Sequence, residues 1–201
     1  MVATGNTRVP YSPRWDGMDR FAGTMLHTSK YKTGAPFRGQ RVLVVGFGNS
    51  ACEIAIDLHE SGAHPALAVR GPVNVIPRDI FGISVLSLGI LQRLLPARVA
   101  DAINAPIVNA VIGDITRLGL RKLPYGATTQ IREHAQVPLL DIGTIALIRQ
   151  GAIAVRPGIA RFTADTVVFD DGTTEPYDAV ILGTGYRAAL GELLAGVNGV
   201  L

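Results

Sequence analysis

Two apolar runs on either side of an amphipathic segment dominate the hydrophobic pattern in the first half of the chain. Val42–Val45 is continuous and β-branched, which is typical of a strand buried on both faces of a parallel sheet. Ala66–Arg70 is a second such run. Between them, Ser50–Ser61 carries apolar positions at helical spacing and ends before Gly62, a residue type that commonly stops helices. The pattern therefore predicts a β-α-β unit closed by a right-handed crossover.

The middle of the chain has a mainly helical pattern. An apolar stretch rich in Ala, Leu and Val is broken at Pro96 and predicts two helices, Val85–Leu95 and Arg98–Ile112. Gly113–Pro138 has the composition of a loop, and a short helix is expected at Thr144–Arg149.

Short strands return in the last third of the chain. Ala152–Val155 and Ala179–Leu182 predict strands, the second of them buried on both faces. Val167–Phe169 and Thr174–Tyr177 flank an Asp-Asp-Gly-Thr turn, which predicts a hairpin. Val2–Gly5 has the pattern of a strand tail for which no nearby segment supplies a pairing partner. Alternation of strands and helices predicts the α/β class.

Composition and charge exclude several classes of protein. Of the 201 residues, 48% are hydrophobic and 17% are charged, which is typical of a globular chain. The formal net charge is only +3 and the basic residues are scattered, so no nucleic-acid-binding surface is expected. The four histidines lack the spacing of zinc ligands, so no metal site is expected either.

The cytoplasm is the expected location. A single cysteine, Cys52, excludes an internal disulfide and a Cys-x-x-Cys redox pair, and it suits a reducing compartment. The N-terminus lacks the apolar core of a signal peptide. Ile83–Leu95 is too short and too interrupted to span a bilayer. The apolar helices within 83–112 are expected to cover the sheet and a neighbouring domain, with a homodimer or membrane-surface patch as the alternative.

A glycine-rich segment between the first strand and its helix is the strongest functional signal. It matches the G-x-G-x-x-G/A fingerprint of dinucleotide-binding loops in the strand–turn–helix context that the fingerprint requires. Gly46 permits the tight turn, Gly48 lets a pyrophosphate approach the backbone, and Ala51 lets the helix pack on the strand. The amides at the helix start would hold the anion. A glycine-rich turn in an unrelated α/β domain is the alternative. The candidate loop consists of Gly46, Phe47, Gly48, Asn49, Ser50 and Ala51.

The end of the second strand indicates which nucleotide is bound. NAD-binding proteins usually place an acid there to accept a hydrogen bond from the ribose 2′-hydroxyl. This strand instead ends in Arg70, whose guanidinium is suited to pair with a 2′-phosphate. The sequence therefore favours NADPH, with a solvated strand-end arginine as the alternative.

Two further motifs resemble those of the flavin-containing monooxygenase family. Phe21–Lys32 matches the fingerprint F-x-G-x-x-x-H-x-x-x-[YFW], just ahead of the NADPH loop. Gly183–Tyr186 and Ala3–Gly5 resemble the A-T-G type turns at which chains of that family pass between the FAD and NADPH domains, although the first has Gly in place of Ala. The resemblance adds His27, Thr184 and Gly185 to the candidate cofactor-binding residues.

Within that family, three stretches resemble the YUCCA subgroup of indole-3-pyruvate monooxygenases: Val73–Arg78, Gly113–Leu120 and Val137–Thr144. The resemblance covers nearly the whole chain. It implies FAD and NADPH as cofactors and a small-molecule substrate and O₂ as partners. Only one of the family's two glycine-rich loops is present, so we expect a fragment that lacks the N-terminal FAD-binding motif and the C-terminus.

The resemblance also implies how the chain is divided. We expect Rossmann-like NADPH-binding residues 38–160 with a helical insertion at 83–138. Residues 1–37 would be a linker and a residual FAD-domain segment with the fingerprint. Residues 161–201 would form a hairpin and return toward the FAD domain, so that the chain carries partial strands of that domain.

The activity implied is that of an NADPH- and FAD-dependent monooxygenase. It would insert one oxygen atom from O₂ through a flavin C4a-(hydro)peroxide, and with indole-3-pyruvate it would give indole-3-acetate by oxidative decarboxylation. An N- or S-oxygenating or Baeyer–Villiger-type flavin monooxygenase is one alternative, and a non-catalytic NADPH-binding module is another. No residue is assigned a catalytic role, since Asp141, Arg78 and Glu53 are better explained as structural. We expect the fragment alone to have no monooxygenase activity.

Overall fold

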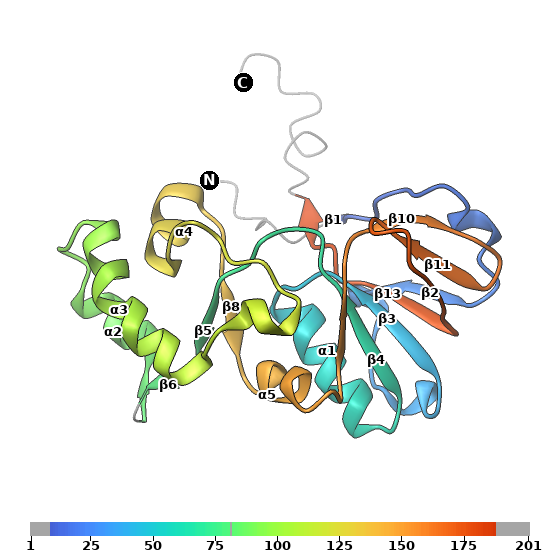
Figure 1. The fold of residues 1–201 in the computed structure, drawn as a ribbon, viewed down its shortest axis with the longest axis horizontal. Coiled ribbons are helices and arrows are strands. Elements are labelled where there is room, and N and C mark those ends of the chain that lie inside the picture. The colour runs from blue at the N-terminus through green and yellow to red at the C-terminus, as the bar shows by residue number, and fades with distance from the viewer. Residues whose placement is uncertain (1–8, 81, 188–201) are drawn as a thin grey trace, which may run out of the picture.

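A parallel sheet forms the centre of the computed structural model, which describes residues 9–80 and 82–187 (Figure 1). The strand order is β2-β13-β3-β4-β9, and every neighbouring pair is parallel. The prediction of an α/β protein with a Rossmann-like parallel sheet is confirmed. The five strands are β2 (Thr24–His27), β13 (Ala179–Leu182), β3 (Arg41–Val45), β4 (His64–Ala68) and β9 (Ala154–Arg156).

The two faces of the sheet are covered by different layers. Successive side chains of a strand point to opposite faces. Val42 and Val44 of β3 therefore join one core with helices α1 (Asn49–Glu60) and α5 (Thr144–Arg149), while Leu43 joins a second core on the other face. Burial on both faces explains why these strands are continuous apolar runs.

A three-stranded antiparallel sheet supplies the second covering layer. Its strand order is β10-β11-β12, and β11 and β12 form the predicted hairpin. The layer packs on the sheet through Phe162, Val167 and Phe169, which are almost fully buried. Its strands are β10 (Ile159–Phe162), β11 (Thr166–Phe169) and β12 (Thr174–Pro176).

Two strands of the central sheet come from outside residues 38–160. β2 lies before this range and β13 after it, and β13 pairs with both β2 and β3. The division of the chain into 1–37, 38–160 and 161–201 stays a prediction, but the sheet itself combines all three ranges. β2 was not expected, since four residues of mixed polarity give little strand signal.

The insertion between β4 and β9 is helical, as predicted, and extends to the left in Figure 1. It is joined to the rest by the parallel pair β5 (Val75–Pro77) and β8 (Leu139–Asp141). Its remaining elements are β6 (Asp79–Ile80), β7 (Ile83–Ser84), α2 (Val85–Leu91), α3 (Ala97–Ile112), the 3₁₀ turn η4 (Ile115–Leu118) and α4 (Ala127–His134).

Helix α4 corrects the expectation of a loop through 113–138. Two consecutive threonines lower the local helix propensity, so the pattern is weak. The helix is instead capped from a distance, because Asp101 of α3 accepts hydrogen bonds from the amides of Thr128 (2.8 Å) and Thr129 (3.0 Å).

The second predicted strand begins and ends earlier than the sequence pattern indicated. β4 runs from His64 to Ala68, because its pairing partner β3 ends at Val45, opposite Ala68. Arg70 therefore lies in the loop beyond the strand and is exposed.

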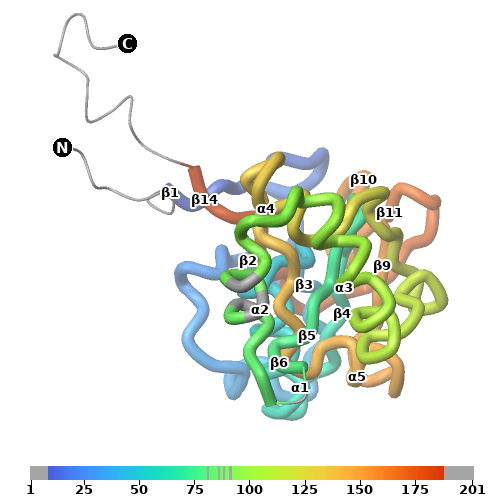
Figure 2. The backbone as a smooth tube through the Cα atoms, turned by 90° about the vertical axis from the view of Figure 1, so that its left-hand side faces the viewer, coloured from blue at the N-terminus to red at the C-terminus, as the bar shows by residue number. Residues whose placement is uncertain are grey.

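Two short strands lie side by side where the described chain begins and ends. β1 (Val9–Pro10) and β14 (Tyr186–Arg187) form an antiparallel pair at one edge of the molecule (Figures 1 and 2). The predicted strand tail at Val2–Gly5 and the Ala3–Gly5 turn lie outside the described residues. Three 3₁₀ turns complete the fold: η1 (Met18–Arg20), η2 (Thr28–Lys30) and η3 (Ala35–Phe37).

Candidate functional site

The turn between β3 and α1 has a shape that requires glycine at its first position. Gly46 has φ +122°, a backbone conformation that residues with a side chain rarely adopt. A Cβ placed there would lie 2.5 Å from the carbonyl oxygen of Gly183. The Gly46 amide donates to Ala68 (2.9 Å), which fixes the turn to the end of β4. Phe47 is half-buried and packs against the core beneath α1.

Gly48 leaves open space in front of the first turn of α1. It is the N-cap of the helix, in extended conformation, and a Cβ placed on it would meet no atom within 4 Å. Because glycine has no side chain, this N-cap residue makes no side-chain capping hydrogen bond, and the first turn holds no acidic residue. The amides at this end of the twelve-residue helix therefore face open space with the positive end of the helix dipole behind them. This arrangement can hold a phosphate group.

Ala51 and Gly183 form a close contact behind the loop. Ala51 is buried, and a Cβ on Gly183 would lie 2.7 Å from the Cβ of Ala51 and 3.0 Å from the Val45 oxygen. Glycine at 183 therefore permits alanine at 51. This packing explains why Gly183 stands where the A-T-G pattern has alanine.

The two polar side chains of the loop differ in their surroundings. Asn49 is half-buried, and its Oδ1 accepts from the amide of Leu140 (2.9 Å), which joins the start of α1 to β8. Ser50 is exposed and borders a cavity of about 340 Å³ beside Glu53 and Tyr186. Among the described residues, the Ser50 hydroxyl therefore has no protein hydrogen-bond partner, whereas the Asn49 side chain has one.

A second arginine lies beside Arg70. The Arg121 guanidinium donates from Nη2 to the main-chain oxygen of Arg70, although the two residues are 51 positions apart. Lys122 follows, and the main chain beside it forms a parallel bridge with Val73. A second guanidinium group therefore lies at the loop beyond β4. The sequence analysis missed Arg121, and the only available signal was the Arg-Lys pair in a segment expected to be a loop.

The described structure gives His27 a structural environment. It is 7% exposed, its Nδ1 accepts from the Ser29 amide (3.1 Å), and its Nε2 donates to the Gly185 oxygen (3.0 Å). The ring also packs edge-on against Tyr186, with 5.1 Å between the centroids. His27 therefore holds the end of β2 against the turn that follows β13.

Thr184 and Gly185 connect the two strands at the edge of the molecule. The Thr184 hydroxyl donates to the Tyr11 oxygen, and the Tyr11 amide donates to the Gly185 oxygen (2.9 Å). Gly185 has φ +81°, which favours glycine. The segment at Tyr11 and the turn after β13 are thus joined to each other beside the candidate loop.

The last residue of the fingerprint contacts α1. The Tyr31 hydroxyl donates to Asp57 Oδ2 (2.6 Å), and the Gly34 amide donates to the same atom (2.9 Å). Burial, followed by the hydrogen bond and charge of Asp57, raises the pKa of Tyr31 well above its ordinary value. The fingerprint therefore fixes both the helix and the turn after β13.

Two further titratable groups near the loop have structural roles. Asp141 accepts from the amides of Gly143 and Ile145 and so caps α5. Cys52 lies on the buried face of α1, and this burial raises the pKa of its thiol. Within residues 9–80 and 82–187, no three His, Cys, Asp or Glu side chains gather as metal ligands would. No helix in the same part of the chain combines the length and apolar character needed to cross a membrane.

Known proteins resemble this chain in sequence and in fold. A family model described as flavin-binding monooxygenase-like matches residues 1–196. The chain is 44% identical over 191 residues to indole-3-pyruvate monooxygenase YUCCA6 of Arabidopsis thaliana, covering 94% of this chain and 46% of that protein. It is 39% identical over 189 residues to indole-3-pyruvate monooxygenase YUCCA1 of Oryza sativa subsp. japonica, covering 94% and 47%. The chain thus spans about half the length of the curated relatives it matches.

The fold is also shared with a solved structure. Cyclohexanone monooxygenase from Rhodococcus sp. Phi1 bound to NADP⁺ matches with a TM-score of 0.70 at 20% identity, over 94% of this chain and 46% of that chain.

Proposed function

The chain belongs to the flavin-binding monooxygenase-like family, and from this premise we propose that it forms the NADPH-binding part of an NADPH- and FAD-dependent monooxygenase. The observation that carries the proposal is the open space at Gly48. There the helix start presents its amides to a volume that a side chain would otherwise fill. In this proposal the diphosphate lies against the loop from Gly46 to Ala51, and Ser50 adds a hydroxyl.

The 2′-phosphate of the nucleotide would lie at Arg70 and Arg121. The hydrogen bond between Arg121 and the Arg70 backbone supports this placement, since it brings a second guanidinium to the loop beyond β4. No acid occupies the end of β4, where an NAD-binding protein would need one. Two guanidinium groups give a dianion charge-assisted hydrogen bonds that a hydroxyl cannot use.

The other candidate residues would affect nucleotide binding indirectly, by holding the turn after β13 in place. His27, Thr184 and Gly185 hold the turn after β13 against the segment at Tyr11, and Gly183 of this turn packs on Gly46 and Ala51. We therefore propose that they position the loop rather than touch the nucleotide. FAD, when bound in the whole protein, would supply the oxygen-transfer chemistry.

We propose an apolar keto acid as the substrate, with O₂ as the second reactant. This rests on the relatives at 38–44% identity, whose names give indole-3-pyruvate. The residues of this chain would bind and orient NADPH.

Two further proposals concern the setting of the protein. We propose a cytoplasmic location, supported by the buried lone thiol of Cys52. We also propose a homodimer that uses α3, because this helix exposes apolar side chains four positions apart. These are Val99, Ile103, Ile107 and Val111, between 38% and 48% exposed.

A nucleotide titration tests the nucleotide proposal. The chain is titrated with NADPH and with NADH, and the titrations are repeated with Arg70→Glu and with Arg20→Glu, an exposed control on η1. We expect NADPH to bind about tenfold or more tightly than NADH, equivalent to about 1.4 kcal/mol, and Arg70→Glu alone to abolish the preference. Equal affinities of the unmodified chain for both nucleotides would overturn the assignment.

A further inference from the structure

The turn between β9 and β10 lies beside the loop that carries Arg70. β9 is a neighbour of β4 in the sheet, with Ala68 opposite Arg156, and the Val69 amide donates to the Arg156 oxygen (2.8 Å). Parallel strands bring their carboxyl ends to one edge of a sheet, where nucleotides bind. Gly158, in the turn that follows β9, is buried and therefore lies next to the position proposed for the 2′-phosphate.

Two side chains lie against Gly158 and leave no room for a third. The backbone of Gly158 does not have the positive φ that favours glycine, so the reason for glycine lies in packing. A Cβ placed there would collide with Asp170 Oδ2 and would lie 3.3 Å from Arg70 Cγ. Asp170 directly follows β11, and its amide donates to the Gly158 oxygen (2.8 Å). Glycine at 158 therefore lets a carboxylate approach the stem of Arg70.

The Asp170 carboxylate and the Arg70 guanidinium are both available to a ligand. Both residues are exposed. Neither side chain makes an ion pair or a hydrogen bond with any residue in 9–80 or 82–187. A ligand group that binds over Gly158 therefore meets an anion and a cation, each without a protein partner in that part of the chain.

Neighbouring charged side chains, by contrast, already have partners. The Arg156 Nη2 pairs with Glu175 Oε1 (2.8 Å), which joins the end of β9 to β12. Asp171, the next residue after Asp170, accepts from the Thr173 amide (2.9 Å) within the hairpin turn. These charges stabilise the protein itself, so they are less suited to contact a nucleotide.

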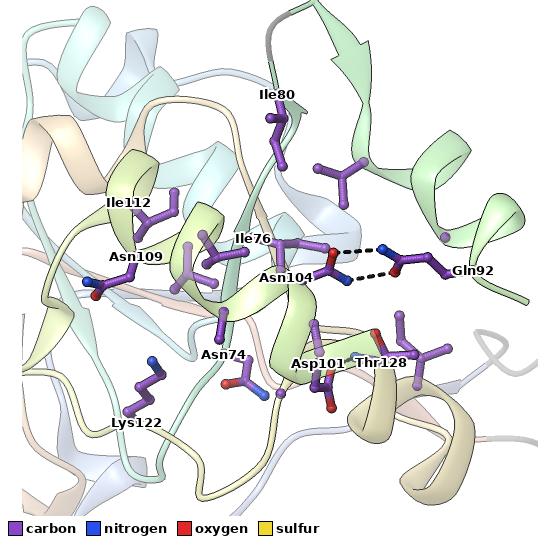
Figure 3. Close-up of a pocket in the computed structure, with 18 of the residues that line it drawn as sticks. Asn74, Ile76, Ile80, Gln92, Asp101, Asn104, Asn109, Ile112, Lys122 and Thr128 are labelled. Atoms are coloured by element: carbon purple, nitrogen blue, oxygen red, sulfur yellow. Dashed lines mark hydrogen bonds between the residues drawn. The ribbon is translucent and has the colours of Figure 1, made fainter. Parts of the chain in front are cut away.

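The lysine that follows Arg121 faces a different region. Lys122 lines a cavity of about 380 Å³ in the helical insertion, where it lies near Asn74 (Figure 3). Of the basic residues at the loop beyond β4, Arg70 is thus the one whose side chain shares Gly158 with a carboxylate.

We propose that Asp170 is a second determinant of nucleotide choice and that it limits the preference for NADPH. This inference rests on the proposed function, and in it the 2′ substituent of the ribose lies between Arg70 and Asp170. A carboxylate accepts a hydrogen bond from a 2′-hydroxyl and repels a 2′-phosphate, whereas a guanidinium favours the phosphate. The acid that the end of β4 lacks is supplied by the residue after β11.

Nucleotide titrations of variants at two neighbouring aspartates test the inference. The dissociation constants of NADPH and NADH are measured for the unmodified chain, for Asp170→Asn and for Asp170→Lys. Asp171→Asn and Asp171→Lys are the matched controls, because they make the same charge changes one residue along the same turn.

We expect Asp170→Asn to raise the ratio of NADPH affinity to NADH affinity about threefold or more, and Asp170→Lys to raise it further. NADPH should bind more tightly and NADH more weakly, whereas a merely structural role would move both affinities in the same direction. The gain for NADPH should shrink at about 1 M salt, because the two side chains are exposed and the repulsion is screened. The controls should stay within about twofold of the unmodified chain, since the Asp171 carboxylate is not at Gly158.

The outcomes separate this inference from the proposed function. A preference for NADPH that Asp170→Asn leaves unchanged, or an equal shift for both nucleotides, overturns the inference and leaves the proposed function in place. Equal affinities in the unmodified chain that become a preference for NADPH in Asp170→Asn would remove the NADPH assignment and support the role of the carboxylate. Binding of neither nucleotide to the unmodified chain overturns both.

Discussion

At the scale of single residues, the candidate loop depends on small side chains that meet from separate segments. Gly46, Ala51 and Gly183 lie together where the loop packs against the turn after β13. The fingerprint G-x-G-x-x-G/A accepts alanine at its last position, but this contact leaves room for only one Cβ. Alanine at 51 is therefore accompanied by glycine at 183, where the A-T-G pattern has alanine.

Exchange of these two residues should show the coupling. Gly183→Ala places a Cβ 2.7 Å from that of Ala51, and we expect overpacking to cost about 1–3 kcal/mol of the free energy of unfolding. Ala51→Gly alone should cost about 1 kcal/mol, since it puts glycine into a helix. In the double variant the first penalty should largely disappear, giving a coupling energy of about 1–2 kcal/mol in urea unfolding. Simple additivity of the two changes would show that the contact does not limit position 183.

At the scale of elements, local patterns predicted those segments whose structure is decided locally. β3, α1 and the β11–β12 hairpin were predicted because each has its own apolar period or turn signal. Helix α4 was missed because its cap comes from Asp101, 27 positions earlier in the sequence. The placement of Arg121 beside Arg70 was missed for the same reason, since no local pattern records a contact across 51 positions.

The distant cap gives α4 a testable dependence on Asp101. Each carboxylate oxygen accepts from one amide, so Asp101→Asn keeps one acceptor and turns an NH₂ group toward the other amide. We expect a loss of about 1–2 kcal/mol in the free energy of unfolding at pH 7. Hydrogen exchange of the Thr128 and Thr129 amides should rise in the variant. Unchanged exchange at both amides would exclude the cap.

The same contact should appear in the pH dependence of stability. Hydrogen bonds from Thr129 and Thr128 keep the folded-state pKa of Asp101 below its ordinary value, despite the opposing effect of burial. The stabilisation is therefore present above the unfolded-state pKa and is lost as the pH falls through the folded-state pKa. The difference in stability between the unmodified chain and Asp101→Asn should shrink on acidification below about pH 4.

At the scale of the whole molecule, contacts between distant segments place the candidate loop. The turn after β13 packs on the loop, His27 holds that turn to β2, and Tyr11 holds it to β1. The fingerprint around His27 was identified from the sequence. Its contact with the turn after β13 could not be predicted, because His27 and Gly185 are 158 positions apart. Membership of the flavin-binding monooxygenase-like family agrees with this arrangement.

The exposed apolar face of α3 leads us to predict that the chain forms a homodimer. Ile103 is 48% exposed, and the helix carries no charged residue after Asp101. If a second copy covers this face, the chain should show a concentration-dependent dimer in sedimentation equilibrium, and Ile103→Glu should be a monomer. Lys32→Glu, an exposed change outside the insertion, should leave the dimer intact. A monomer at every concentration of the unmodified chain contradicts the proposed homodimer.

The central claim is that backbone amides at the start of α1 hold the diphosphate of NADPH. Its most direct test is a titration of the ¹⁵N-labelled chain with NADPH, followed through the backbone amide resonances. We predict that the largest shifts occur at residues 46–51 and at 70–71, in the loop beyond β4. Saturation with NADPH that leaves the amides of Gly48, Asn49 and Ser50 unshifted would contradict the account.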